Sequence, residues 1–337
     1  MAILIVAHDE ASVIGQLILS IKNALSSRDR VYVIADNCTD DTAQLAAGAG
    51  AAVRSRRTGG PEGKGAALQW FINRERTALE EFNLVAILDA DGQVPSDFVN
   101  EAKAAFNGEA VIQCFVKPVN YCGSAIGTLS ALSEILEQKT FDRIRSWLGW
   151  PIRLRGTGML IPPAALINVS DRIQTEVEDI ALSLLFASVG IPIKKTDKVS
   201  VYDPKPLEPA SASKQRARWF RGQWVAFWHY RPEVLKLLAR GPAGWSLLGS
   251  LFLKPLWLLD TIILLFAILF YFYSPIISAV LGSILAFDIL CLVYTIACLE
   301  DKKTFIKAIF HFPAFIVMWL RGFVLAFQKS PWRRARE

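Results

Sequence analysis

Short apolar runs alternate with segments of helical spacing along the first 240 residues of the chain. The apolar runs have the length of buried strands, and they lie at residues 2–7, 31–36, 51–55 and 84–91. The segments between them predict helices at residues 10–24, 44–50 and 65–82. Strands that alternate with helices favour parallel βαβ units, so the sequence predicts an α/β domain with a mainly parallel, Rossmann-like sheet and flanking helices.

Acidic residues stand at or just past the ends of these predicted strands, namely Asp9, Asp36, Asp89 and Asp91. In open α/β sheets, ligands bind beyond the carboxyl ends of the strands. Side chains two positions apart on a strand share a face, so Asp89 and Asp91 are expected to repel each other unless a cation lies between them. A solvated Asp-Gly turn is the structural alternative. The pattern indicates a site for a divalent cation or a polyol.

Familiar nucleotide and calcium motifs are incomplete. Residues 58–65 (TGGPEGKG) resemble a phosphate-binding loop, but Thr58 replaces the first glycine and no Ser or Thr follows Lys64. The Gly48-Ala-Gly50 stretch lacks the third glycine of a dinucleotide fingerprint. Asn100 occupies the position of the final Glu of an EF-hand loop. These three classes of site are therefore excluded.

Apolar residues are concentrated after residue 244. Residues 255–273 and 276–299 are each long enough to cross about 30 Å of hydrocarbon, and each contains one acid, Asp260 or Asp288. The segment 304–327 contains several charged residues, and we expect it to be interfacial or re-entrant, with a third span as the alternative.

Three regions follow from this pattern: a catalytic domain at 1–210, amphipathic interfacial helices at 211–244, and a membrane region at 245–337.

Charge and cysteine content agree with a membrane-bound chain whose domain faces the cytosol. Hydrophobic residues make up 53% of the sequence and the net charge is +6. Basic residues cluster at 214–221 and 331–337, as is typical of the cytoplasmic face of a membrane. The adjoining apolar segments favour lipid over nucleic acid as the partner of these clusters. Five cysteines without a CxxC pair disfavour a disulfide framework or a zinc site.

A helix is predicted to begin near Glu178-Asp179, within residues 174–193. Its expected buried face consists of Leu182, Leu185, Phe186 and Val189. Acids in a first turn suit the helix dipole, which is the structural interpretation. The functional interpretation is a general base at a helix start, which deprotonates a hydroxyl nucleophile.

A second helix is predicted over residues 211–230, where aromatic and basic side chains alternate. Its apolar face is expected to contain Phe220, Trp224, Phe227 and Trp228. Such a helix is typical of a membrane interface. Trp219 lies beside Gln215 and Arg218 in its first half, and these side chains offer a stacking face and donors to a sugar or a phosphate.

Taken in order, these motifs resemble the family 2 glycosyltransferases, especially the membrane-embedded members with a D, DxD, ED, QxxRW series. Cellulose, chitin and hyaluronan synthases and ceramide glucosyltransferases belong to that group. The resemblance covers about residues 2–232. The matching pieces are AHDEA (7–11), ADNCTDDT (35–42), GKGAAL (63–68), LDADGQVPSDF (88–98), GTGML (156–160), EDIALSLLFASVG (178–190) and QRARW (215–219).

The resemblance implies a GT-A type fold and assigns a role to each matching residue. Asp179 would be the catalytic base, and Asp89 and Asp91 would bind Mg²⁺ or Mn²⁺, with Asp91 the more direct ligand. The residues implied for the nucleotide sugar are Asp9, Glu10, Asp36, Lys64, Asp89, Asp91, Gln215, Arg218 and Trp219. Those implied for the acceptor are Gly156, Thr157, Gly158, Glu178 and Trp219.

The implied activity is inverting transfer of a sugar from a nucleoside diphosphate sugar, chiefly a UDP-sugar, to a hydroxyl of a polysaccharide or lipid-linked acceptor. Single addition to a lipid is an alternative to polymer synthesis, because the chain has few spans for an export channel. A nucleotidyltransferase and an inactive subunit of a synthase complex are the rival classes. The expected location is the inner (plasma) membrane, multi-pass, with the catalytic domain in the cytosol. Other membrane subunits remain an open class of partner.

Overall fold

A seven-stranded mixed sheet forms the centre of the protein, in the order β3-β2-β1-β4-β6-β5-β7. The computed structural model describes residues 1–58 and 63–328, so the C-terminal basic cluster and part of the 58–65 loop lie outside the described residues. The strands are β1 (Ala2–Ala7), β2 (Arg30–Asp36), β3 (Ala52–Arg56), β4 (Val85–Asp89), β5 (Val111–Val119), β6 (Met159–Ile161) and β7 (Ile193–Pro204).

The parallel half of the sheet is the half that the sequence pattern predicts. β1 pairs in parallel with β2 and β4, and β2 pairs in parallel with β3. On the other side, β6 runs antiparallel to both β4 and β5, while β5 and β7 are parallel. The prediction of a mainly parallel sheet with flanking helices is therefore confirmed. The short β6 escapes a pattern search because it spans only three residues.

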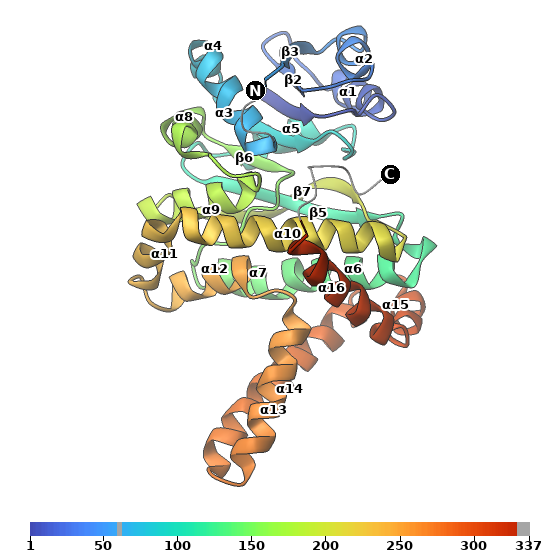
Figure 1. Cartoon of the computed structure of the whole chain (residues 1–337). Coiled ribbons are helices and arrows are strands. Elements are labelled where there is room, and N and C mark those ends of the chain that lie inside the picture. Colours follow the sequence, from blue (N-terminus) through green and yellow to red (C-terminus); the bar gives the residue numbers. More distant parts are fainter. Residues whose placement is uncertain (59–62, 329–337) are drawn as a thin grey trace.

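Helices cover both faces of the sheet in this domain (Figure 1). The helices of the domain are α1 (Ile14–Lys22), α2 (Thr42–Gly48), α3 (Lys64–Arg74), α4 (Arg76–Glu80), α5 (Phe98–Ala105), α6 (Ala125–Leu136), α7 (Asp142–Trp147), α8 (Pro163–Val169) and α9 (Glu178–Val189), of which α6 packs mainly against the C-terminal helices. The single helix expected over residues 65–82 is divided at Glu75, where φ is −106°, so α3 and α4 are separate elements.

Two hydrophobic clusters lie on opposite faces of the sheet, because successive strand side chains point in opposite directions. On β1, Ile3 and Ile5 join the cluster that contains residues of α1 and α5. Ala2 and Leu4 join the other cluster, which contains residues of α3, α8 and α9. The sheet is thus the middle layer of an α/β/α arrangement, and its strand ends are free to carry polar side chains.

The prediction of one buried face on α9 is wrong. Residues from Ile180 to Ser188 are buried on every side of the helix, whereas Val189 is 55% exposed. The helix lies within the larger hydrophobic cluster, between the sheet and helices α8 and α11 (Arg231–Leu238). A helix that is enclosed by its neighbours needs no polar face, so the spacing of its apolar residues does not show which side is buried.

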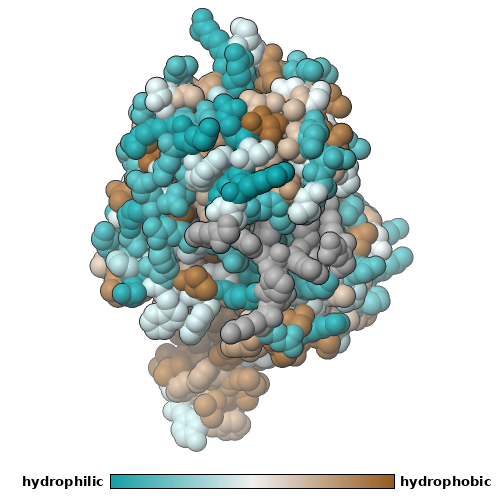
Figure 2. Space-filling view, turned by 45° about the horizontal axis from the view of Figure 1, so that its top comes forward, coloured by the Kyte–Doolittle hydropathy of each residue, from teal (hydrophilic) through white to brown (hydrophobic). Residues whose placement is uncertain are grey.

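The C-terminal third is helical, and its helices α13 and α14 extend away from the rest of the protein (Figure 1). Its remaining helices are α10 (Pro209–His229), α12 (Pro242–Phe252), α13 (Leu256–Tyr271), α14 (Pro275–Ala297), α15 (Lys302–Ile309) and α16 (Phe312–Ala326). α13 and α14 form a protruding hairpin whose surface is apolar (Figure 2), with Leu265 62% exposed and Leu290 66% exposed. α15 packs on α6, and α16 packs along α10.

In the described part of the chain, α14 is the helix that is long and apolar enough by itself to cross a membrane. Two bent pairs would raise the number of spans to three if each crossed as one unit. These pairs are α12 with α13, bent by 114°, and α15 with α16, bent by 69°. α13 is shorter than the expected span at 255–273. The sharp bend within 304–327 is compatible with the interfacial or re-entrant form expected for that segment.

The apolar face expected on α10 is divided between buried and exposed side chains. Phe220 packs against Trp319 of α16, and Phe227 packs against Phe252 of α12. Trp224 and Trp228 instead remain 67% and 52% exposed. The face therefore serves partly as a helix–helix interface, which the sequence pattern of α10 alone cannot distinguish from a lipid-facing surface.

Candidate active site

The ends of β1 and β2 carry a hydrogen-bonded polar group. Asp9 has a positive φ of 53°, and its Oδ1 accepts a hydrogen bond from the amide of Thr39 at 2.6 Å. At the end of β2, Asp36 is buried and pairs with Arg56 of β3, with 2.5 Å between Oδ1 and Nη1. Glu10 donates its amide to the hydroxyl of Thr42. Three predicted donor-site residues, Asp9, Glu10 and Asp36, thus lie at or just past the ends of two neighbouring strands.

Lys64 lies at the centre of a second group, at the end of β4. Its Nζ donates to Asp89 Oδ1 at 2.6 Å and to the carbonyl of Gly156 at 2.6 Å, and it lies 2.9 Å from Glu178 Oε1. Four predicted site residues from distant parts of the sequence therefore meet at one ammonium group.

Asp89 and Asp91 do not share a strand face as expected, because β4 ends at Asp89. Ala90 is buried, and Asp91 follows in a half-buried turn. The charge of Asp89 is balanced by the ammonium of Lys64. The sequence pattern missed this pairing because Lys64 is 25 residues away.

Residues 156–158, which precede β6, form one side of the Lys64 group, its wall. Gly156 has a φ of +80°, and a Cβ there would lie 3.3 Å from Glu178 Oε1 and 3.8 Å from Lys64 Nζ. Thr157 is buried and accepts a hydrogen bond from the Asp89 amide through its hydroxyl. Gly158 also has a positive φ, and a Cβ there would lie 2.9 Å from a methyl group of Val201. Glycine is needed at 156 and 158 for conformation and space.

Gln113 of β5 holds this wall, and the sequence analysis missed it. Its side-chain amide donates to the carbonyl of Thr157 at 2.8 Å, and its Oε1 accepts from the amide of Arg155 at 2.9 Å. The side chain is 1% exposed. A polar residue inside the apolar run VIQCFV is the signal that could have identified it, since buried amides are retained where both ends are hydrogen-bonded.

The pKa values of the two carboxyl groups at the start of α9, Glu178 and Asp179, are raised above their usual values. Burial raises the pKa of Glu178 to about 7, with the neighbouring Asp179 adding to the effect and Lys64 opposing it. Burial also raises the pKa of Asp179, while Arg153 and the Ile180 amide act in the opposite direction. For Lys64, burial lowers the pKa, but Asp89 and Glu178 outweigh burial and hold it above its usual value. Lys64 therefore stays charged, and one of its carboxyl neighbours can hold a proton near neutral pH.

Gly65 brings Lys64 close to the segment that precedes α9. A Cβ at this position would lie 2.1 Å from the carbonyl oxygen of Thr175, whereas one at Gly15 of α1 would have no neighbour within 4 Å. We expect Gly65→Ala to lower the free energy of unfolding by about 3 kcal/mol, because the backbone must shift. Gly15→Ala is the matched control and should raise it by about 0.5–1 kcal/mol. Thermal unfolding measures both, and equal midpoints for the two variants would contradict the close contact.

The QxxRW residues lie on α10, apart from the Lys64 group. Gln215 Oε1 accepts a hydrogen bond from Arg216, and the same guanidinium lies over the ring of Trp219. Across the described residues, no hydrogen bond or ion pair joins Gln215, Arg218 or Trp219 to Lys64, Asp89 or Asp179. α10 nevertheless approaches the start of α9, since a Cβ at Gly222 would lie 2.3 Å from a methyl group of Val177.

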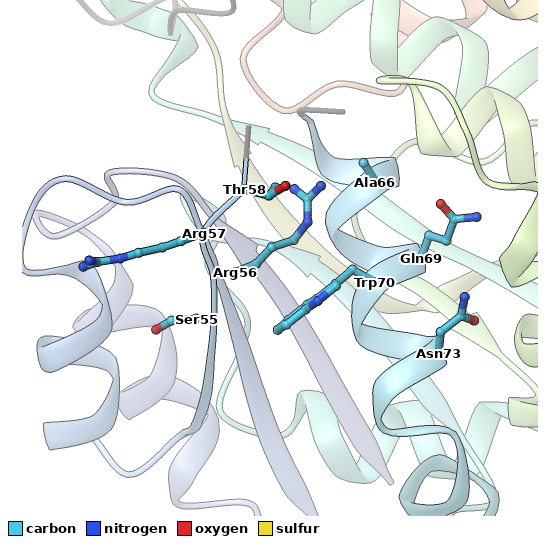
Figure 3. A pocket seen from close by; sticks show the side chains of 8 residues that line it. All are labelled: Ser55, Arg56, Arg57, Thr58, Ala66, Gln69, Trp70 and Asn73. Carbon is cyan, nitrogen blue, oxygen red and sulfur yellow. The ribbon is translucent and has the colours of Figure 1, made fainter. Parts of the chain in front are cut away.

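A cavity of about 550 Å³ lies beside the first polar group, between the end of β3 and α3 (Figure 3). Its lining residues are Ser55, Arg56, Arg57, Thr58, Ala66, Gln69, Trp70 and Asn73. None of them is a predicted site residue, but Arg56 connects the cavity to Asp36. The cavity is therefore adjacent to the predicted nucleotide side of the site and separate from the Lys64 group.

The residues predicted to bind a metal fit a hard divalent cation. Carboxylate oxygens are the ligands that Mg²⁺ and Mn²⁺ prefer. The side chain of Asp89 is 35% exposed, and within the described structure its Oδ2 accepts no hydrogen bond, so one oxygen is available to a ligand. Asp9, Cys38 and Asp40 also bring ligand atoms within 4.8 Å of one another, but this group is part of the hydrogen-bonded β1–β2 loops.

Comparison with known proteins finds a family model that matches the N-terminal two thirds of the chain and a solved structure with a similar fold. The model of the family described as "Glycosyltransferase like family 2" matches residues 1–222. A mannosyltransferase from Pyrobaculum calidifontis, solved with GDP-Man and Mn²⁺, is 15% identical in sequence. That likeness covers 96% of this chain and 85% of the other, with a TM-score of 0.50, and it concerns the fold.

Two curated relatives are similar in sequence, and both are named beta-monoglucosyldiacylglycerol synthase. The proteins from Nostoc sp. and from Trichormus variabilis are each 25% identical over 273 residues. The match covers 77% of this chain and 56% of each relative. The chain therefore spans little more than half the length of these relatives.

Proposed function

The chain belongs to the glycosyltransferase family 2-like proteins, and from this premise we propose that it transfers a sugar from a nucleoside diphosphate sugar to a hydroxyl group of a membrane lipid. The observation that carries the proposal is the Lys64 group, in which Asp89, Gly156 and Glu178 converge on one ammonium. This group lies at the carboxyl end of β4, where a ligand of an open α/β sheet is expected.

The donor is proposed to lie across the ends of β1, β2 and β4. Asp9, Glu10 and Asp36 would contact the nucleoside, with Arg56 orienting Asp36. Lys64 would lie near the diphosphate, where its ion pair with Asp89 fixes that carboxylate. Gln215 and Arg218 of α10 would approach the diphosphate from the other side after donor binding.

Asp91 and Asp89 would hold a Mg²⁺ or Mn²⁺ ion. When bound, such an ion stabilises the negative charge that develops on the departing nucleoside diphosphate. The protein residues around it have their own tasks: Lys64 keeps Asp89 in place, and the glycines at 156 and 158 allow the wall to approach the donor without a side chain in between.

Asp179 is proposed as the general base. The acceptor hydroxyl oxygen forms a bond to the anomeric carbon, the bond from that carbon to the diphosphate oxygen breaks, and the hydroxyl proton passes to Asp179. One displacement from the opposite side inverts the anomeric centre, so an α-linked donor yields a β-linked product. Glu178, which shares the ion-pair group with Lys64, would bind the acceptor together with Thr157 and Trp219.

A lipid acceptor is favoured by two observations. The curated relatives carry the name of a synthase of a glucosylated diacylglycerol. The exposed Trp224 and Trp228 of α10 and the apolar hairpin α13–α14 suit a bilayer and its interface, where indole rings are enriched. We place the domain at 1–210 on the cytosolic face, with 211–244 at the interface and 245–337 in or on the inner membrane.

The test uses the full chain in vesicles that contain diacylglycerol, supplied with UDP- and GDP-sugars and Mn²⁺. We expect release of nucleoside diphosphate that requires both the lipid and the metal, together with a lipid product that carries one sugar. Chelation by EDTA should remove the release. Release of pyrophosphate would instead indicate nucleotidyl transfer, and a growing polysaccharide in the absence of diacylglycerol would overturn the lipid acceptor.

A further inference from the structure

The side chain of Arg216 is buried between three helices. It is 4% exposed and lies on α10, where α6 and α16 meet it. Its Nη1 donates to Gln215 Oε1 at 2.9 Å, and its Nη2 donates to the hydroxyl of Ser130 of α6 at 3.2 Å. Both of these partners are neutral. The guanidinium therefore ties a residue of the QxxRW series to α6.

Two indole rings enclose the guanidinium. Its Cζ lies 4.2 Å from the ring centroid of Trp219 and 4.8 Å from that of Trp319 of α16. Over the described ranges, no carboxylate oxygen lies within 4.0 Å of Arg216. The two indoles thus help to stabilise the buried charge, since a cation over a tryptophan face is attracted to it.

Close packing of α16 on α10 fixes the second ring. A Cβ at Gly322 of α16 would lie 2.7 Å from Arg216 Cβ and 3.1 Å from the carbonyl oxygen of Ser213. The hydroxyl of Ser213 also donates to the carbonyl of Met318 at 3.0 Å. α16 is therefore held directly against the QxxRW residues of α10.

We propose that Arg216 is a positioning residue that holds Gln215 and Trp219 in their working orientation, with Trp319 of α16 as its support. The proposal rests on the proposed function, because it concerns the same site. It extends the catalytic unit to α16, which lies beyond the 222 residues that the family model matches. Arg216 acts through the two motif residues it touches.

The geometry requires a planar cation. The cation lies over both indole rings and donates to Gln215 and Ser130 through two different nitrogens, which suits the planar fork of a guanidinium. A lysine ammonium keeps the charge but cannot stack on two faces and donate to both side chains in this arrangement. A role limited to helix packing would instead tolerate any long side chain of similar volume.

The first test compares Arg216→Lys and Arg216→Met with Arg231→Met, an exposed arginine at the start of α11. We expect both Arg216 variants to lower kcat about tenfold to 10²-fold and to weaken UDP binding more than threefold, because Gln215 and Trp219 are proposed to contact the donor. Arg231→Met should match wild type. Equal kcat in Arg216→Lys and wild type, or a loss that follows only the folded fraction measured by size-exclusion chromatography, would overturn the positioning role.

A second pair of variants keeps the inference testable if Arg216 variants fail to fold. Trp319→Phe preserves an aromatic face and should keep kcat within threefold, whereas Trp319→Leu should lower it about tenfold, as expected for a misplaced group. Gly322→Ala should also lower kcat, while Gly282→Ala of α14, where a Cβ meets nothing within 4 Å, should not. Equal kcat in Trp319→Leu and Trp319→Phe would overturn the support from α16.

Failure of this inference and failure of the proposed function give different results. If wild-type protein transfers no sugar from any nucleotide sugar, the proposed function is wrong. If wild type is active and the Arg216 and Trp319 variants equal it, only the positioning role is wrong.

Discussion

Asp179→Asn is expected to lower the rate of sugar transfer by about 10³-fold, the range found when a general base is removed. Asparagine keeps the size of the side chain and its contact with the amide of Ile180, which Oδ1 makes at 2.9 Å. UDP affinity should remain within threefold, because Asp179 is proposed to act on the acceptor proton and not on the nucleotide. Steady-state transfer with diacylglycerol vesicles and calorimetric titration of UDP measure the two effects.

The pH profile provides the complementary readout. Burial raises the pKa of Asp179 above its usual 3.8, so the residue takes up a proton at a higher pH than an ordinary aspartate. The base must be ionised to work. Wild-type kcat/KM should therefore fall as the pH decreases through this raised pKa. The residual kcat/KM of Asp179→Asn should not show this decrease at low pH. Asp197→Asn, at an exposed site, is the matched control. Equal turnover in Asp179→Asn and wild type would refute the assigned base.

Lys64→Met is expected to destabilise the fold by about 3 kcal/mol at pH 8 and to abolish most transfer. The ammonium faces Glu178, whose side chain is 7% exposed, and loss of one member of a buried pair leaves an uncompensated charge. The pair with Asp89 contributes less, because the side chain of Asp89 is 35% exposed and solvent screens it. Thermal unfolding followed by circular dichroism measures the loss.

The titration of Glu178 determines how the loss of stability in Lys64→Met changes with pH. The folded-state pKa of Glu178 is already raised to about 7 from 4.5, and removal of Lys64 raises it further. A raised carboxyl pKa favours the fold at low pH and loses that effect as the pH rises through the folded pKa. The deficit of Lys64→Met relative to wild type should therefore be smaller at pH 5 than at pH 8. The double variant Lys64→Met with Glu178→Gln should recover part of the stability at pH 8, and no recovery would contradict the buried pair.

The sequence predicted the parts of the fold that depend on local pattern. Strands β1, β2 and β4 were found from their apolar runs, and the acids at their ends were found because a βαβ arrangement brings strand ends to one edge. The start of α9 at Glu178 was also found. The motifs pointed to the correct family, since the family model covers residues 1–222.

The parts that depend on tertiary contacts could not be predicted. The pairing of Lys64 with Asp89 and Glu178 joins residues up to 114 positions apart, which no local period reveals. Gln113 holds the wall of the site from a strand that reads as ordinary core, and Arg216 occupies a variable position of a motif. The burial of α9 on every side followed from its neighbours and not from its own spacing.

The central claim is that one carboxylate-lined site holds the metal and the donor diphosphate together. Calorimetry tests it most directly, by measuring the affinity for UDP with and without Mn²⁺ in wild type and in Asp91→Asn. We expect Mn²⁺ to raise the affinity of wild type about tenfold or more, and to have little effect on Asp91→Asn, because Asp91 would hold the ion and the ion's charge would favour the diphosphate. The same UDP affinity with and without Mn²⁺ in wild type, or a Mn²⁺ effect of equal size in Asp91→Asn, would contradict the account.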